Sequence, residues 1–272
     1  MSIRTFLLMA GLAGCGVDGN LTPQPDVPVS LPACVPNRDG AITADELPIA
    51  LGATSTYYTG TGRAFDAVGT VRGDTRVYDL SQELPDDVVI ELGPTALGAQ
   101  WYAASFTQGQ FTVAAGSGLD GIYHQDAQAL WLDGIASHDE SPPAGKTLVR
   151  YPQPLPVLRF PIVEGLAYTV TAAIPDGIIA GLPFIGTDEL SVDVSGTGRL
   201  DLPYVRFSPV LRVRTRVTRK PSTGTPVITK RTTLWLFECF GELARAESNP
   251  NEPDPDFTTA SYLRRFALGG QP

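Results

Sequence analysis

The stretch VLRVRTRVTR at residues 210–219 decides the fold class, because apolar and basic residues alternate along it. One face carries Leu211, Val213, Thr215 and Val217, and the other carries Arg212, Arg214 and Arg216. A period of two is typical of a β-strand with one buried face. The turn-rich segment KPSTGTP follows at 220–226, and a second apolar stretch follows at 227–240. The pattern predicts an antiparallel hairpin.

Similar alternation extends over most of the chain. It recurs at 166–174 and 190–194, and earlier strand candidates are 55–65, 75–79, 88–92, 100–106, 110–115 and 128–132. A turn at 107–109 predicts a second hairpin. Helical signals are few: a capping box at 43–46, a short helix predicted at 242–247, and a helix or last strand at 259–268. We predict an all-β protein whose antiparallel sheets form a sandwich or a curved half-barrel, with one or two short helical turns.

Composition supports this class and excludes others. Of 272 residues, 43% are hydrophobic and 18% charged, which argues against disorder throughout. The 28 Gly and 24 Pro fit many short strands joined by turns. The net charge of −9 argues against a nucleic-acid partner, which needs a basic surface. With only two His, the sequence offers little for catalysis or zinc binding.

The N-terminus predicts export. Residues 1–14 combine one Arg, a short apolar run and small residues, as secretory signal peptides do. The tetrad Leu12-Ala13-Gly14-Cys15 resembles the lipobox of bacterial lipoproteins. The resemblance implies cleavage before Cys15, lipidation of its sulfur and attachment to a membrane, and Gly16 favours the outer membrane, facing the periplasm or the cell surface. An ordinary signal peptide with a chance cysteine is the alternative.

The predicted domain organisation has three parts. A signal peptide at 1–14 precedes a lipidated, flexible tether at 15–33, which is rich in Pro and Gly. A single β-rich body follows at 34–272, with a possible internal boundary near 141–161, where six prolines occur.

Two cysteines remain once Cys15 carries lipid. Cys34 and Cys239 form an even pair in a compartment that permits disulfides, so we predict a bond between them. A buried free thiol at Cys239 and an intermolecular partner for Cys34 are the alternatives.

The segment NRDGAITADE at 37–46 resembles the calcium loop of EF-hand and dockerin-like modules. The resemblance implies calcium as a cofactor. The implied ligands are Asn37, Asp39, the Ala41 carbonyl, Thr43 through water, and the closing carboxylate Glu46, with Gly40 at the turn. Val35 stands where the pattern has Asp. The alternative is a metal-free Asp-Gly turn followed by a capping box.

The basic face of 210–219 gives a second candidate site. Arg212, Arg214 and Arg216 could bind an anion or a lipid headgroup, or they could pair with Asp and Glu of neighbouring strands. His124 and His138 lack the sequence context of a serine hydrolase, so no catalytic residue is predicted. The segment 195–214 faintly resembles stretches of secreted β-rich bacterial proteins, and no function comes with that likeness.

From the sequence we expect a lipid-anchored envelope protein with a non-enzymatic binding or structural role. Its partners would be the membrane, through the lipid, and a protein, glycan or lipid ligand. One alternative is a carrier of a lipid or another hydrophobic ligand, with an apolar pocket lined by Val170, Val192, Leu211, Val213 and Trp235. An envelope hydrolase is the remaining alternative, and it needs a His within hydrogen-bond reach of a Ser and a carboxylate.

Overall fold

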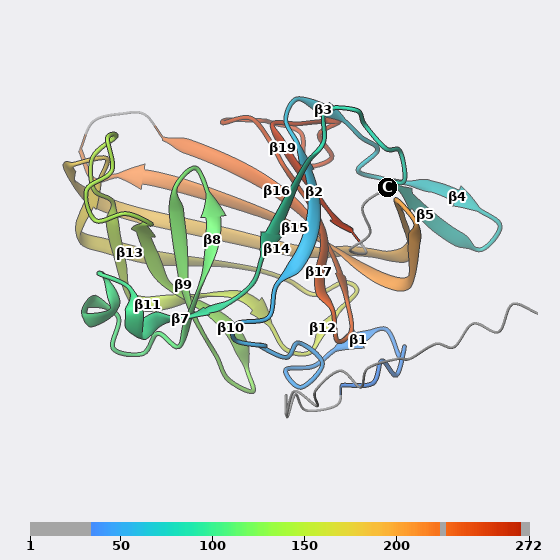
Figure 1. Cartoon of the computed structure of the whole chain (residues 1–272), viewed down its shortest axis with the longest axis horizontal. Helices are drawn as coiled ribbons and strands as arrows, with labels where there is room; N and C mark the ends of the chain where they lie inside the picture. Colours follow the sequence, from blue (N-terminus) through green and yellow to red (C-terminus); the bar gives the residue numbers. More distant parts are fainter. Residues whose placement is uncertain (1–33, 224–226, 268–272) are drawn as a thin grey trace, which may run out of the picture. The chain divides into compact units, whose positions relative to one another are not determined.

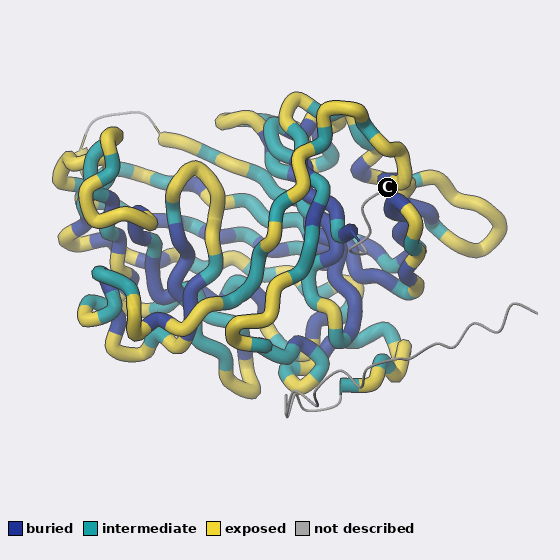
Figure 2. The backbone as a smooth tube through the Cα atoms, viewed as in Figure 1, coloured by how far each residue is buried: buried dark blue, intermediate teal, exposed yellow. Residues whose placement is uncertain are grey.

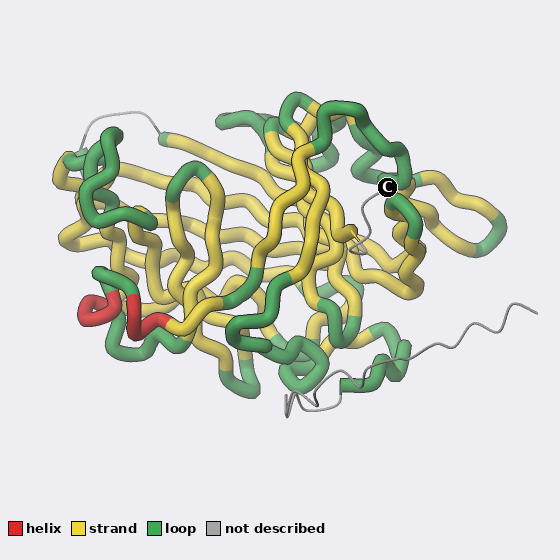
Figure 3. Tube along the Cα trace, in the orientation of Figure 1, coloured by secondary structure: helices red, strands yellow, loops and turns green. Residues whose placement is uncertain are grey.

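β-strands make up most of the chain that the computed structural model describes, residues 34–223 and 227–267 (Figures 1 and 3). Two short 3₁₀ turns, η1 (Leu97–Ala99) and η2 (Ala103–Ser105), accompany them. The strands are β1 (Ala41–Ile42), β2 (Ser55–Gly60), β3 (Arg63–Ala64), β4 (Thr70–Arg72), β5 (Thr75–Asp79), β6 (Val88–Leu92), β7 (Thr95–Ala96), β8 (Phe111–Gly116), β9 (Leu119–Gln125), β10 (Ala129–Ser137), β11 (Leu148–Arg159), β12 (Ile162–Val163), β13 (Ala167–Ile179), β14 (Leu182–Leu202), β15 (Val205–Pro221), β16 (Ile228–Phe237), β17 (Gly241–Glu247), β18 (Thr259–Ala260) and β19 (Tyr262–Ala267). The predicted all-β antiparallel class is confirmed.

One large sheet contains most of these strands. Its order in the described residues is β6-β2-β19-β17-β16-β15-β14-β13-β11-β10-β9-β8-β7, and β5 pairs in parallel with β14. The strands at the two ends of this path, β6 and β7, are consecutive in sequence and are separated by only Gly93 and Pro94. The sheet therefore curls back on itself without closing.

The hairpin predicted from 210–219 is confirmed as β15 and β16. Their register runs without a break from Leu211↔Leu236 to Arg219↔Ile228. On the apolar face of β15, Leu211 and Val213 are buried, whereas Val217 farther along the same face is exposed. Alternation thus predicts the side that enters the core in the first half of 210–219.

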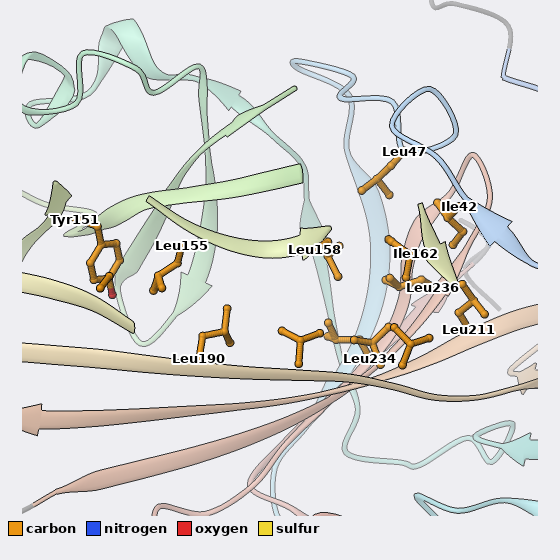
Figure 4. Packing of buried hydrophobic residues seen from close by; sticks show 14 of the residues in the cluster. Ile42, Leu47, Tyr151, Leu155, Leu158, Ile162, Leu190, Leu211, Leu234 and Leu236 are labelled. Carbon is orange, nitrogen blue, oxygen red and sulfur yellow. The ribbon is translucent and has the colours of Figure 1, made fainter. Parts of the chain in front are cut away.

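The main core lies between two parts of the curled sheet. Figure 4 shows Leu190 and Leu234 on one side and Tyr151, Leu155 and Leu158 facing them from β11. Strand β11 can cover this face because it leaves the plane of the long strands after a single pair with β13, Leu148↔Ile178. A second cluster packs around the fully buried Trp235. Figure 2 shows the burial concentrated along the strands, with the exposed residues mainly in the connections.

The strand predicted at 100–106 is wrong, and so is the hairpin predicted around 107–109, although the chain does turn there. This segment contains η2, and Gly109 N donates to the Phe106 carbonyl at 3.2 Å. Tyr102 and Phe106 flank η2, and both are buried in a third hydrophobic cluster with Ile122 of β9 and Ala136 of β10. Their packing in this cluster outweighs the strand propensity of the segment.

The helix predicted at 242–247 is also wrong, because these residues form β17. Ala244 and Ala246 are buried while Arg245 lies opposite Leu234 of β16 and Arg264 of β19. Pairing on both sides outweighs the local helix propensity. The segment 259–268, predicted as a helix or a last strand, forms β18 and β19 as far as residue 267.

The proline-rich segment at 141–161 contains β11, which continues through Pro152, Pro154 and Pro156. The described residues belong to one compact unit. The predicted signal peptide at 1–14, lipidation at Cys15 and tether at 15–33 lie outside them. No helix within the described ranges has the length and apolar character needed to cross a bilayer.

Candidate functional site

Three neighbouring strands lose their regular register in the same part of the sheet. In β10, Asp133 is left out between the pairs Leu132↔Leu155 and Gly134↔Arg150, so residues 151–154 of β11 bulge opposite it. In β13, residues 175–176 bulge between Ile174 and Gly177. Bulges redirect side chains and are common beside binding and active sites.

These bulges surround a cleft with a volume of about 360 Å³. The cleft opens where β11 and β13 diverge after their single pair, and the segment that follows η2 covers one side. It is lined by Ser105, Phe106, Thr107, Gln108, Asp133, Arg150, Tyr151, Pro152, Pro154, Pro175 and Asp176. Its volume is in the range of small-molecule sites.

Asp133 is the buried charged group of this cleft. It is 6% exposed, and its Oδ2 lies 2.8 Å from His124 Nδ1. Because a carboxylate only accepts, the imidazole donates through Nδ1. The imidazole stacks on Trp131 with ring centroids 5.9 Å apart, which fixes its orientation. Burial raises the pKa of Asp133. The hydrogen bond with His124 and the charge of its imidazole lower the pKa, but by less than burial raises it.

Gly134 makes the close approach of β10 and β11 possible. A β-carbon at this position would collide with the carbonyl oxygen of Val149 and with the ring of Phe106. A glycine directly after Asp133 therefore lets the bulge pack against β11.

A buried polar triad supports the floor of the cleft. The Tyr151 hydroxyl donates to Asp188 Oδ2 at 2.6 Å, and Arg219 donates to both oxygens of Asp188 at 2.8 and 2.6 Å. Asp188 is fully buried. Burial and the adjacent Asp188 raise the pKa of Tyr151 well above its ordinary value, so Tyr151 stays protonated and holds its position as a donor. At the rim of the cleft, Arg150 pairs with Asp176.

Both histidines are held by aspartates, and neither reaches a serine. His138 Nδ1 lies 2.9 Å from Asp120 Oδ2, which also accepts from the Tyr102 hydroxyl at 2.7 Å. Among the described residues, no hydrogen bond joins either imidazole to a serine hydroxyl. The arrangement expected of a serine hydrolase is therefore not formed in this part of the chain.

The predicted disulfide between Cys34 and Cys239 is present, with 5.5 Å between the α-carbons. Cys239 N also donates to the Glu46 carbonyl at 2.7 Å, and Arg38 N donates to Glu238 Oε2 at 2.7 Å. The bond and these two contacts fasten the start of the body to the end of β16.

The loop at 37–46 is satisfied by its own hydrogen bonds. Asn37 Oδ1 and Asp39 Oδ1 accept from the backbone of Asp39 and Ala41. Glu46 Oε2 accepts from the Thr43 backbone and hydroxyl, both at 2.9 Å. Asn37 Nδ2 donates to Asp39 Oδ2 and Glu46 Oε1, so the carboxylates that the calcium pattern would use accept hydrogen bonds within the loop. No cluster of three or more metal-binding side chains occurs in the described residues, and calcium at this loop stays a prediction.

The predicted anion patch is occupied by carboxylates of the same chain. Arg212 and Arg214 both pair with Asp256, and Arg214 also pairs with Asp193. Arg216 Nη2 donates to the Ser191 hydroxyl at 3.3 Å. The acidic loop at 249–256 thus covers part of the basic face of β15, as expected if the arginines pair within the protein.

The residues predicted to line a carrier pocket lie in packed clusters. Val192, Leu211 and Val213 are buried in the main core, with Val170 packed against it, and Trp235 is buried in the second cluster. Residues of the opposing strands β11 and β12 pack against Val192, Leu211 and Val213 in the main core.

Comparison of the chain with protein families, characterised proteins and solved structures gives no match. The cleft was not predicted from the sequence, although the sequence contains a signal for each bulge. These signals are Asp133-Gly134 inside an apolar strand, the alternating prolines at 152, 154 and 156, and Pro175-Asp176-Gly177 inside another strand. Proline within a strand marks a bulge because it cannot donate a hydrogen bond to the ladder, and glycine does so because it weakens the strand and lets backbones approach closely.

Proposed function

We propose that this protein is a lipid-anchored envelope protein that binds a small ligand in the cleft between β10, β11 and β13. The observation that carries the proposal is the coincidence of three bulges around one buried carboxylate, Asp133. A regular sheet would be more stable, so three departures from register at one place favour a role in binding.

The role is binding rather than catalysis, because the cleft offers a positioned carboxylate without a nucleophile beside it. His124 holds Asp133 through Nδ1, while Ser105 and Thr107 line the cleft without a hydrogen bond to either group. A carboxylate held by a second side chain is suited to orienting a ligand.

Blocking the cleft tests this role. Gln108 is exposed at the rim, and Gln108→Trp would place an indole over the opening without changing a buried residue. A small-molecule library is screened by melting temperature against the wild type and Gln108→Trp. Compounds that stabilise only the wild type would support the proposal. If every stabilising compound acted equally on both proteins, the cleft would not be the ligand site.

The proposed anchor is the lipid on Cys15, and it is supported by the resemblance of residues 12–15 to the lipobox. The disulfide between Cys34 and Cys239 agrees with an oxidising compartment outside the cytosol. Cells that produce the wild type or Cys15→Ser are labelled with an alkyne fatty acid and fractionated. Label and membrane association should be present in the wild type and lost in Cys15→Ser. Recovery of unlabelled wild-type chain in the cytosol, with all three thiols free, would overturn the anchor.

A further inference from the structure

We infer that the ligand of the cleft is a small organic cation, whose ammonium or guanidinium group pairs with Asp133. This inference rests on the proposed function of the cleft, and it adds the chemical class of the ligand.

The charges around the cleft favour a cation. Arg150 and Asp176 neutralise each other at the rim. His124 donates one hydrogen bond to Asp133 Oδ2, and Oδ1 accepts none from the described residues. The acceptor of Asp133 that a cationic ligand would use is therefore Oδ1, since His124 already donates to Oδ2. A buried carboxylate repels an anionic ligand and gains most from a charged donor.

The ligand class is organic rather than metallic. No set of three or more metal-binding side chains meets in the described residues, and Asp133 by itself supplies too few oxygens for Ca²⁺ or Mg²⁺. The walls also favour an organic group, because the rings of Pro152, Pro154 and Pro175 line the cleft beside Phe106 and Tyr151. An alkyl chain can lie against these rings while its charged end reaches Asp133.

A neutral polyol is the competing ligand, since Ser105, Thr107 and Gln108 can bind hydroxyl groups. Ser105 is the last residue of η2, and Thr107 and Gln108 follow it, so these three side chains lie on one side of the cleft, whereas Asp133 is buried. A polyol that used only the rim would leave Asp133 without a charged partner. The cation satisfies the buried group. Asp176, the other carboxylate that lines the cleft, is exposed and already pairs with Arg150.

The experiment measures binding of three probes to the full-length protein in detergent by ligand-observed NMR and calorimetry. Agmatine carries a guanidinium and an ammonium group, sucrose is a neutral polyol, and glutarate is an anion. We expect agmatine to bind, with affinity reduced at least tenfold by Asp133→Asn. The matched control is Asp74→Asn, which removes the same charge at an exposed position of the β4–β5 turn and should change the affinity less than twofold. Equal affinity in the wild type and in a folded Asp133→Asn variant would overturn the inference.

A second variant keeps the test decisive if Asp133→Asn does not fold. Gln108→Trp leaves Asp133 in place and should abolish agmatine binding, and retained binding would overturn the inference. If sucrose binds, agmatine does not, and Gln108→Trp abolishes sucrose binding, then the cation is wrong while the cleft remains the ligand site. If Gln108→Trp affects no probe, both the inference and the proposed cleft are overturned.

Discussion

The hairpin of β15 and β16 and the pair of β10 and β11 are both antiparallel, but only the first keeps its register. The first keeps nine consecutive pairs in register, and the second has seven pairs with two breaks. On the outer face of β15 the arginines meet carboxylates of the same chain, whereas among the described residues the buried Asp133 of β10 is hydrogen-bonded by the imidazole of His124 alone. The regular hairpin thus pairs its charges within the protein, and the irregular pair contains the carboxylate for which we propose a ligand.

This difference separates residues that stabilise the fold from residues that form the site. Natural sites retain features that cost stability, because binding needs groups that the fold alone does not satisfy. The predictions below therefore contrast substitutions in the regular strands with substitutions around the cleft.

The largest expected effect is in the regular strands, at Trp235 of β16. Trp235 is fully buried and packs against Tyr78 with ring centroids 5.8 Å apart. Trp235→Ala should lower the free energy of unfolding by about 4 kcal/mol, because it leaves a large cavity. Urea denaturation measures this. Gln108→Ala at the rim of the cleft is the comparison and should change the stability by less than about 0.5 kcal/mol. Similar losses in the two variants would remove the contrast between the regions.

Glu242 of β17 should show the next largest effect. Arg245 lies directly opposite Arg264, and Glu242 accepts hydrogen bonds from both. Burial alone would raise the pKa of Glu242, but these two arginines outweigh it and lower the pKa to about 2. Because the folded value is depressed, the stabilisation is complete above the unfolded value of 4.5 and is lost as the pH falls toward 2.

Glu242→Gln should therefore cost about 3 kcal/mol at neutral pH, since it leaves two facing guanidinium groups without their shared carboxylate. In this variant the free energy of unfolding should also fall less steeply between about pH 5 and pH 2 than it does in the wild type. Urea midpoints measured across this range test both effects. An unchanged acid dependence would contradict the assignment.

The disulfide should contribute at least about 2 kcal/mol, because it joins residues 205 positions apart and restricts the unfolded chain. Cys34→Ser should lower the melting temperature, and adding a reductant to the wild type should lower it similarly. Cys15→Ser is the control, since Cys15 is not part of the bond. A melting temperature that is indifferent to reductant would show that the bond does not stabilise the body.

The sequence predicted the regular region better than the irregular one, for a physical reason. Alternation reports which face of a strand is buried, so 210–219 and its partner were predicted correctly. The segment 100–106 was not, because Tyr102 and Phe106 enter a core formed by strands distant in the sequence. Glycine and proline mark where β10, β11 and β13 bulge, but whether these bulges meet beside Asp133 depends on how the three strands pack, and a local pattern does not contain that information. Such tertiary contacts override local propensity.

Asp133→Asn should change the free energy of unfolding only slightly. The sign should be opposite to that of Glu242→Gln, which lowers it. Burial raises the pKa of Asp133, so the folded protein keeps this proton to a higher pH than the unfolded chain does. The contribution of Asp133 to stability is therefore greatest below its unfolded pKa and is lost as the pH rises through the folded value. Asparagine does not titrate, so the variant does not lose this contribution as the pH rises. At pH 7 the free energy of unfolding of Asp133→Asn should equal that of the wild type or exceed it by no more than about 1 kcal/mol. A clear destabilisation at pH 7 would assign Asp133 to the structure rather than to ligand binding.

The smallest expected effect is that of calcium on the loop at 37–46. The hydrogen bonds from Asn37 Nδ2 to Asp39 and Glu46 already satisfy the two carboxylates that a cation would need. Binding calcium would break these bonds, and Asn37 Oδ1 would lose the hydrogen bond that it accepts from the backbone N–H of Asp39. The melting temperature should therefore be the same in millimolar calcium and in excess chelator. A rise in melting temperature that depends on calcium and is abolished by Glu46→Gln would show that the loop rearranges around the ion. The loop would then be a second binding region, in addition to the cleft.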